Sequence, residues 1–176
     1  MSPFKLCLLA LYFSSCAQAD CFTVAGNAFG ISPVLLKAIA YKESRLNPTA
    51  INQANRNGSE DVCMMQINSS HFSRLAQLGV SRQRLLSDPC ACVATGAWVL
   101  HGLFRQHGKT WETIGMYNAG SSPARRNIRL RYAEDVKRIY RSLQQKKALN
   151  VPDNSQLAQS DTLSQQKPGA PDQALP

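Results

Sequence analysis

The sequence places one carboxyl where it could act as a general acid. Glu43 falls near the end of a predicted helix over residues 33–44, which begins with Ser32 as its N-cap and Pro33 in its first turn. Three apolar residues precede Glu43 by three, four and seven positions and share its face: Ala40, Ile39 and Leu36. Burial disfavours the charged form of a carboxyl, raises its pKa and lets it hold a proton near neutral pH. The pattern therefore favours proton-transfer chemistry at Glu43, and an ordinary structural acid at the edge of the core is the alternative.

The elements that must position Glu43 are predicted to be helices joined by polar turns. From Asp20 to about Leu143 the sequence shows almost no alternating strand pattern, which indicates one mainly α domain. The predicted helices span residues 21–29, 33–44, 69–77, 81–86, 91–107, 110–116 and 130–144. Residues 47–61 are rich in Asn, Ser and Gly and are expected to form a long loop, with a small hairpin as an option within residues 47–67. Long ordered loops usually carry function, so this one is a candidate wall of a cleft.

The two ends of the chain differ from this domain. Residues 1–19 combine one cation, a short apolar run and the small-x-small sequence Ala17-Gln18-Ala19, which is typical of a secretory signal peptide. We therefore expect export to the periplasm and no transmembrane segment, with a lipid-modified Cys16 as the alternative processing. Residues 146–176 are rich in Gln, Ser, Pro and Asp and are expected to form a disordered tail.

The chain is basic, with 20 Lys and Arg against 11 Asp and Glu and a formal net charge of +9. Such a charge suits anionic partners such as cell-wall polymer, a membrane surface or nucleic acid. The sequence has no zinc-finger spacing, no aromatic RNA-binding motif and no basic recognition helix, and export argues further against nucleic acid. We therefore expect no nucleic acid partner.

Four cysteines follow the predicted cleavage site: Cys21, Cys63, Cys90 and Cys92. An even number of cysteines in an exported chain predicts disulfides, and four cysteines allow three pairings. Cys90-Ala-Cys92 and the three histidines show no usual metal-ligand spacing. We therefore expect neither a metal site nor a cofactor.

Three separated blocks carry the strongest functional signal: Ala38 to Ser44, Met64-Met65-Gln66-Ile67-Asn68, and Met116-Tyr117-Asn118-Ala119-Gly120. Asp88-Pro89 and Gly96-Ala97-Trp98 lie between the second and third blocks, and Tyr132-Ala133 follows the third. In this order and spacing the blocks resemble the soluble lytic transglycosylases, which are lysozyme-like enzymes that cut bacterial peptidoglycan. The resemblance is closest to small exported members of secretion and conjugation systems. It implies a mainly α, lysozyme-like single domain of the goose-lysozyme and transglycosylase type, catalytic over residues 20–145.

The resemblance implies that Glu43 is the sole catalytic acid and base. It would protonate the glycosidic oxygen between N-acetylmuramic acid and N-acetylglucosamine, and then accept a proton from the muramoyl 6-hydroxyl as that hydroxyl attacks the anomeric carbon. One carboxyl suffices for this 1,6-anhydro product because the nucleophile belongs to the substrate. Ser44 would face the substrate site and orient Glu43, or would bond to the backbone at the helix end. The other residues that the resemblance places along the substrate are Met65, Gln66, Asn68, Tyr117, Asn118 and Tyr132.

Asp61 departs from the family pattern, because many transglycosylases have no acid at this place. It lies eighteen residues after Glu43, a separation comparable to that between the two carboxylates of animal-type lysozymes. An Asp in the cleft could stabilise oxocarbenium charge or support hydrolysis through water. The alternative is an Asp that caps a turn.

Two cysteines also depart from the family. Cys63 stands where relatives usually have glycine before the Met-Gln block, and Cys92 stands where they commonly have Asn. The resemblance implies a disulfide between Cys21 and Cys90, as in secretion-linked relatives, and two unusual cysteines suggest a second disulfide between Cys63 and Cys92. A side chain at position 63 would tolerate a positive φ poorly.

The expected partners are peptidoglycan glycan strands and components of a type III or type IV secretion, conjugation or pilus apparatus, with the chain acting as a monomer. Two other functions remain open: a lysozyme-type hydrolase that uses Glu43 and Asp61, and a non-catalytic protein that binds the cell wall as a scaffold. The intact Glu43 argues against the scaffold.

Overall fold

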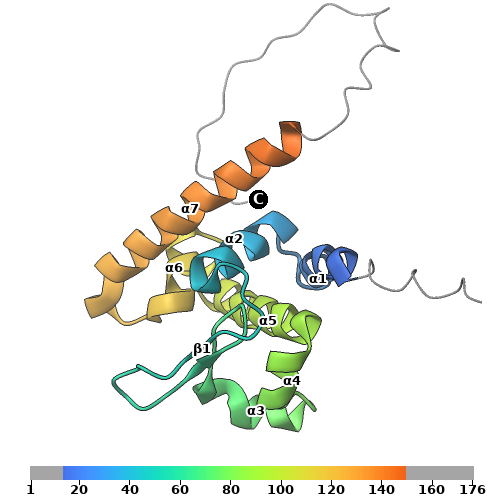
Figure 1. Ribbon diagram of the computed structural model, residues 1–176. Coiled ribbons are helices and arrows are strands. Elements are labelled where there is room, and N and C mark those ends of the chain that lie inside the picture. Colours follow the sequence, from blue (N-terminus) through green and yellow to red (C-terminus); the bar gives the residue numbers. More distant parts are fainter. Residues whose placement is uncertain (1–13, 150–176) are drawn as a thin grey trace, which may run out of the picture. The chain divides into compact units, whose positions relative to one another are not determined.

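The computed structural model describes residues 14–149, with side chains from Cys21 onward. It divides into two compact units, the first ending at Gly102 and the second beginning at Leu103 (Figure 1). Residues 1–13 of the predicted signal peptide and residues 150–176 of the predicted tail lie outside the described residues, as does the side chain of Cys16.

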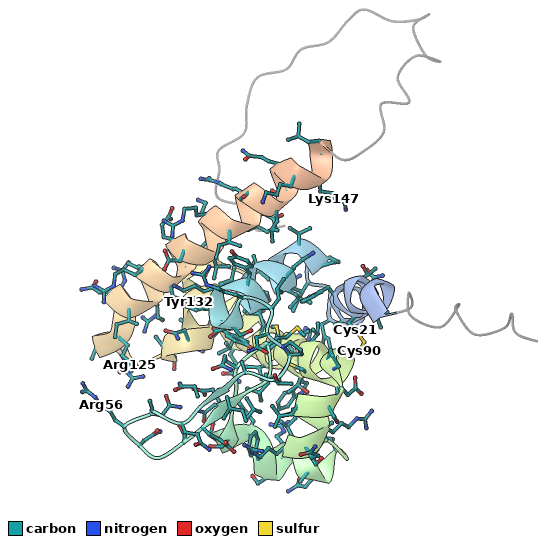
Figure 2. All side chains as sticks on the ribbon, viewed as in Figure 1. Cys21, Arg56, Cys90, Arg125, Tyr132 and Lys147 are labelled. Atoms are coloured by element: carbon teal, nitrogen blue, oxygen red, sulfur yellow. A yellow bond between two sulfur atoms is a disulfide. The ribbon has the colours of Figure 1, made fainter. Side chains whose placement is uncertain are left out.

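The first unit begins with two helices that pack against each other, α1 (Ser14–Phe29) and α2 (Pro33–Ser44). A three-stranded sheet and four further helical segments follow, and the unit boundary falls inside the last of these helices. These segments are β1 (Ile51–Asn52), β2 (Asp61–Val62), β3 (Ile67–Asn68), η1 (Ser69–His71), α3 (Phe72–Gln77), α4 (Arg82–Ser87) and α5 (Pro89–His107). The side chains of Cys21 on α1 and Cys90 on α5 lie side by side as a disulfide (Figure 2).

Helix α2 begins and ends as the sequence predicts. The hydroxyl of Ser32 accepts a hydrogen bond from the backbone N–H of Leu35, and Pro33 occupies the first turn. The helix ends at Arg45, whose φ of 55° is left-handed and whose N–H bonds back into the last turn. The residues of α2 that form the core are Leu35, Leu36, Ala38, Ile39 and Ala40. Because Lys37 and Lys42 are exposed, α2 presents one apolar face to the unit.

The sheet is antiparallel and has the strand order β1-β2-β3, which confirms the small hairpin and adds a third strand. In its register Asp61 on β2 pairs with Asn52 on β1 and with Asn68 on β3. Directly opposed residues of neighbouring strands point to the same face, so these three polar side chains form one row across the sheet. Val62 pairs with Ile67, and both are buried in the core of the unit.

The second unit is a helical pair, α6 (Trp111–Ala119) beside the long α7 (Arg126–Leu149), joined through the 3-10 turn η2 (Pro123–Arg125) (Figure 1). The hydroxyl of Thr110 caps α6 by accepting from the N–H of Thr113 at 3.1 Å. Gly115 lets the helices approach closely, because a Cβ at this position would collide with the backbone of Arg129. The main buried residues of the pair are Ile114, Tyr132, Ala133, Val136 and Tyr140.

The predicted helices are all present, and most of them differ from the prediction at one or both ends. The predicted helix at 69–77 is η1 followed by α3, and the predicted helix at 130–144 extends to residues 126–149. The prediction that the tail begins at residue 146 was therefore early, because Lys146 and Lys147 are helical.

Within residues 14–149 no single helix is long and apolar enough to cross a membrane. Residues Cys21–Phe29 and Pro33–Ser44 meet the length and composition criteria only as a pair, and the two helices are bent by 117°.

Candidate active site

Glu43 lies in the last turn of α2 and is half-buried, as the apolar face of this helix predicts. Two consecutive left-handed residues, Arg45 and Leu46, turn the chain sharply after it, with φ of 55° and 67°. The N–H of Leu46 bonds to the carbonyl of Ala40 at 3.3 Å. Glu43 is therefore carried on a helix end whose geometry is fixed by its own backbone hydrogen bonds.

Ser44 joins the end of α2 to the second sequence block. Its Oγ donates to the carbonyl of Met64 at 2.9 Å and accepts from the N–H of Asn47 at 3.0 Å. The hydroxyl is thus engaged with backbone on both sides, which fits the positioning role and leaves little of it for a sugar. This one bond fixes the residue next to Glu43 against the segment that begins at Cys63.

Residues 63–66 form a tight turn with a left-handed residue at each end. Cys63 has a φ of 62° and Gln66 a φ of 50°. The carbonyl of Cys63 accepts from both the backbone N–H and the side-chain Nε2 of Gln66, each at 3.0 Å. The N–H of Cys63 donates to the carbonyl of Ala50 at 2.8 Å, which ties the turn to the start of the sheet. Gln66 is half-buried, so part of this side chain faces outward from an ordered turn.

The prediction that Met65 lines the substrate surface does not fit the structure. Met65 has no exposed surface, and its side chain lies against Gly96 on α5, where a Cβ would collide with it. Met64 is equally buried. Both methionines fill the core beneath the turn, which is the common use of this flexible side chain.

The disulfide between Cys63 and Cys92 joins this turn to α5. Both cysteines are fully buried, and the N–H of Met65 approaches Cys92 Sγ at 3.3 Å. Together with the disulfide between Cys21 and Cys90, this confirms both predicted pairings. Cys63 adopts the positive φ expected of the glycine that it replaces, although a Cβ disfavours that conformation by about 1–2 kcal/mol.

We expect the disulfide to offset the backbone strain at position 63. The variant Cys63→Ala/Cys92→Ala loses the disulfide and keeps a Cβ at positive φ, so its free energy of unfolding is expected to fall by about 2–5 kcal/mol. The variant Cys63→Gly/Cys92→Ala loses the same bond but is expected to recover about 1 kcal/mol, because glycine accepts this φ. Urea unfolding of both variants measures the difference, and equal stabilities would mean that position 63 carries no strain.

Asp61 does not cap a turn, because its carboxylate accepts from three asparagine amides. Asn52 and Asn55 donate to Oδ2 at 3.1 and 2.8 Å, and Asn68 donates to Oδ1 at 2.7 Å. These donors come from β1, from the loop after it and from β3, so the sheet register fixes the orientation of the carboxylate. Asn68 also caps η1 by accepting from the N–H of Ser70 at 3.0 Å. The amide of Asn68 therefore holds Asp61, where the sequence predicted a contact with substrate.

The residue before Asp61 anchors the sheet to α4. Arg82 donates from Nε and Nη2 to the two carboxylate oxygens of Glu60, at 2.6 and 2.9 Å. These hydrogen bonds from the guanidinium lower the pKa of Glu60 below its ordinary value, against an opposing effect of burial. The backbone carbonyl of Glu60 accepts from Ser69 N–H at 2.8 Å. The strand that carries Asp61 is thus held from both sides.

The bond between Ser44 and Met64 brings the two carboxyl-bearing segments together. Ser44 adjoins Glu43, and Met64 lies three residues after Asp61. Sequence reasoning found both acids but missed Asn52 and Asn55. The cross-strand register is the signal that identifies Asn52 as a partner of Asp61.

The third block lies in the second unit, at the end of α6. Tyr117 is half-buried and Asn118 is exposed, and the helix ends at Gly120 with a φ of 67°. Tyr132 is buried on α7 with 5% of its surface exposed, and Figure 2 shows it in the half of that helix nearer Arg125. Tyr132 therefore lies on the last helix as predicted, whereas the predicted helix over residues 110–116 ended before Tyr117 and Asn118.

Arg129 is a buried cation that sequence reasoning missed. It is 4% exposed and donates to the carbonyl of Ser122 at 2.6 Å and to the Glu112 carboxylate at 3.0 Å. A longer contact of 3.4 Å reaches the carbonyl of Gly120. Arg129 therefore holds the segment that follows Tyr117 and Asn118. Its spacing of three and seven residues from Tyr132 and Val136 places it on the apolar stripe of α7, which is the signal that could have identified it.

We expect Arg129→Met to lower the free energy of unfolding by about 3 kcal/mol, because it removes a buried guanidinium that donates to the carbonyls of Gly120 and Ser122 and to Glu112. The matched control is Arg126→Met, which removes an exposed arginine that contacts the same Glu112 carboxylate at 3.7 Å. That change is expected to cost under about 0.5 kcal/mol. Equal losses in urea unfolding would contradict the assignment of Arg129 as a structural clamp.

Among residues 14–149 no group of three or more His, Cys, Asp or Glu side chains is placed to hold a metal ion.

Comparison with known proteins gives concordant results. Residues 20–140 match the family model described as "Transglycosylase SLT domain". The chain is 43% identical over 148 residues to "Invasion protein IagB" of Salmonella typhi, covering 84% of this chain and 92% of that one. It is 44% identical to "Protein IpgF" of Shigella flexneri, and this match covers 80% of this chain and 91% of that one. It is 39% identical to "X polypeptide" of Escherichia coli, and this match covers 86% of this chain and 91% of that one.

Among solved structures, the chain is similar to an inactive mutant of the lytic transglycosylase Slt from Pseudomonas aeruginosa, with a TM-score of 0.60 and 18% identity. The match covers 78% of this chain and 25% of that enzyme, so the chain spans about a quarter of its length. This likeness concerns the fold, and it agrees with the predicted lysozyme-like, mainly α architecture.

Proposed function

This chain belongs to the transglycosylase SLT family of peptidoglycan lytic enzymes, and from that premise we propose that it cleaves the β-1,4 bond between N-acetylmuramic acid and N-acetylglucosamine. In this proposal Glu43 is the catalytic acid and base. The observation that carries it is the place of Glu43: half-buried at the end of an apolar helix face, beside a serine that bonds across to the Met64 segment.

The reaction needs one carboxyl and no water. Protonated Glu43 donates its proton to the glycosidic oxygen, and the bond from that oxygen to the muramoyl anomeric carbon breaks. The muramoyl 6-hydroxyl attacks the same carbon and gives its proton to the Glu43 carboxylate, which regenerates the acid. The products are a free 4-hydroxyl on one sugar and a 1,6-anhydro ring on the other. An attacking group within the same sugar ring needs no second side chain to position it.

The remaining site residues are given two different roles in this proposal. Gln66, Tyr117, Asn118 and Tyr132 are our candidates for contacts with the glycan, as the family resemblance implies. Ser44 and Asn68 are assigned to positioning, since their polar atoms are engaged within the protein.

A chemical test on digested sacculi distinguishes this function from its rivals. Borohydride reduces the free end of muramic acid that hydrolysis leaves, but it does not reduce a 1,6-anhydro end. We expect the muropeptides released by this chain to resist reduction. Reducible ends would identify a hydrolase, and no release at all would favour a non-catalytic scaffold.

A lysozyme-type hydrolase is the second candidate function, and the geometry of Asp61 favours it. A carboxylate fixed by three amide donors is oriented before substrate binds, as an electrostatic stabiliser of oxocarbenium charge should be. If water entered in place of the 6-hydroxyl, the same pair of acids would support hydrolysis.

We further propose that the chain acts outside the cytoplasm and opens the wall locally for a secretion, conjugation or pilus apparatus. In this proposal residues 1–19 direct export, and the catalytic domain extends from residue 20 to the end of α7. Two disulfides fit an oxidising compartment, and one relative is named an invasion protein. In the source bacterium, deletion of the chain is expected to lower assembly of the apparatus, and wild type but not Glu43→Gln is expected to restore it.

A further inference from the structure

The excess positive charge of this chain is concentrated in one segment. Residues 125–147 contain nine of its 20 Lys and Arg but only two of its 11 Asp and Glu. The segment consists of Arg125, which is the last residue of η2, and nearly all of α7. Figure 2 labels Arg125 and Lys147 near its two ends. The rest of the chain is close to neutral, so the basic character belongs mainly to this helix.

Most of these cations face away from the core of the second unit. Only Arg129 is buried, and only Lys137 is half-buried, over the ring of Trp111 at 5.6 Å. The outer face of α7 lies opposite the buried stripe and is exposed along about five turns. It consists of Asn127, Leu130, Arg131, Glu134, Arg138, Arg141 and Gln145. Three arginines against one glutamate leave this outer face positive.

We propose that the outer face of α7 binds the carboxylates of peptidoglycan peptide stems and holds the enzyme on its polymer. The proposal rests on the function proposed above, because it assigns a second contact with the same substrate. Guanidinium groups bind carboxylates through two parallel hydrogen bonds, which suits arginine better than lysine for this role. A row of fixed cations on a rigid helix matches a polymer that repeats its anionic stems along its length.

Two features favour a polymer over a lipid surface as the occupant. A helix that binds in a bilayer interface inserts an apolar face, but the apolar face of α7 is buried by residues such as Tyr132 and Val136. Leu130 is the one large apolar side chain on the outer face, and it is 38% exposed. The ion pair between Arg138 and Asp135 at 2.7 Å is exposed, so it competes only weakly with an external carboxylate.

Binding to purified sacculi tests the proposal. Cosedimentation is measured in the Glu43→Gln background, so that the polymer is not degraded. We expect Arg131→Gln/Arg138→Gln/Arg141→Gln to bind about tenfold more weakly at low ionic strength, with the difference lost at high salt. The matched control, Lys37→Gln/Arg84→Gln/Arg105→Gln, removes three exposed cations elsewhere, including one that also pairs with an aspartate. It is expected to bind like the parent.

Three further measurements test whether the carboxylates of the polymer are the groups that the outer face binds. Sacculi whose carboxylates have been converted to amides are expected to bind the parent as weakly as unmodified sacculi bind the triple variant. In the active enzyme, which retains Glu43, the triple substitution is expected to leave the rate of cleavage of a peptide-free glycan unchanged. The same substitution is expected to lower the rate of cleavage of sacculi. Equal binding by the two triple variants, full binding to amidated sacculi, or preferential capture by phosphatidylglycerol vesicles would each overturn the proposal. Because cosedimentation does not depend on turnover, it remains informative even if the proposed cleavage chemistry is wrong.

Discussion

Glu43→Gln is expected to lower the rate of glycan cleavage by at least about a thousandfold. The amide keeps the size of the side chain and its place on α2, but it can neither donate the proton that the leaving oxygen needs nor accept one from the 6-hydroxyl. General acid and base catalysis each contribute about a hundredfold to ten-thousandfold, and here one group supplies both. The measurement is the rate of muropeptide release from sacculi.

The matched control for Glu43→Gln is Glu134→Gln, which makes the same change at an exposed position of α7. It is expected to cleave peptide-free glycan at the parental rate. Both variants are expected to unfold at the same urea concentration as the parent, within the small effects of surface changes. A Glu43→Gln variant that still cleaves at the parental rate would remove Glu43 from the chemistry.

Asp61→Asn is expected to lower the cleavage rate by about tenfold to a hundredfold. The substitution removes the negative charge that would stabilise the oxocarbenium-like transition state. It also places an amide nitrogen among three amide donors, which disrupts the network around position 61. The effect is smaller than that of Glu43→Gln because no proton passes through Asp61 in the transglycosylase reaction.

The variant Asn55→Ala separates the effect of the Asp61 charge from the effect of its hydrogen-bond network. It removes one of the donors to Asp61 but keeps the carboxylate. This variant is expected to lose less than about threefold in rate, because two donors still orient Asp61. If Asp61→Asn and Asn55→Ala lose stability equally and neither loses rate, Asp61 is purely structural. If Asp61→Asn selectively removes reducible ends from the products, Asp61 serves a hydrolytic side reaction.

The sequence alone predicts those elements whose signals lie within the element itself. Helix α2 has a cap, a first-turn proline and an apolar stripe, and all three appear in the structure. The end of α7 was placed too early, because the change of composition after residue 145 was given more weight than the helix-forming residues that follow: Lys146, Lys147, Ala148 and Leu149.

The details of the site were less accessible because they depend on contacts between distant residues. Met65 lies in an irregular turn, where neither helical nor strand periodicity tells which side of the chain is buried. The partners of Asp61 depend on strand register, which a polar two-residue strand does not specify. The Cys63–Cys92 pairing was accessible only because two unusual cysteines occur in one family framework.

The central claim is that the substrate supplies its own nucleophile and Glu43 moves the proton. Digestion of sacculi in water enriched in oxygen-18, followed by mass spectrometry, tests this most directly. We predict muropeptides that carry no label and are one water lighter than hydrolysis products, and we predict that Glu43→Gln yields neither kind. Labelled muramic acid ends as the main wild-type product would contradict the account and establish water as the nucleophile.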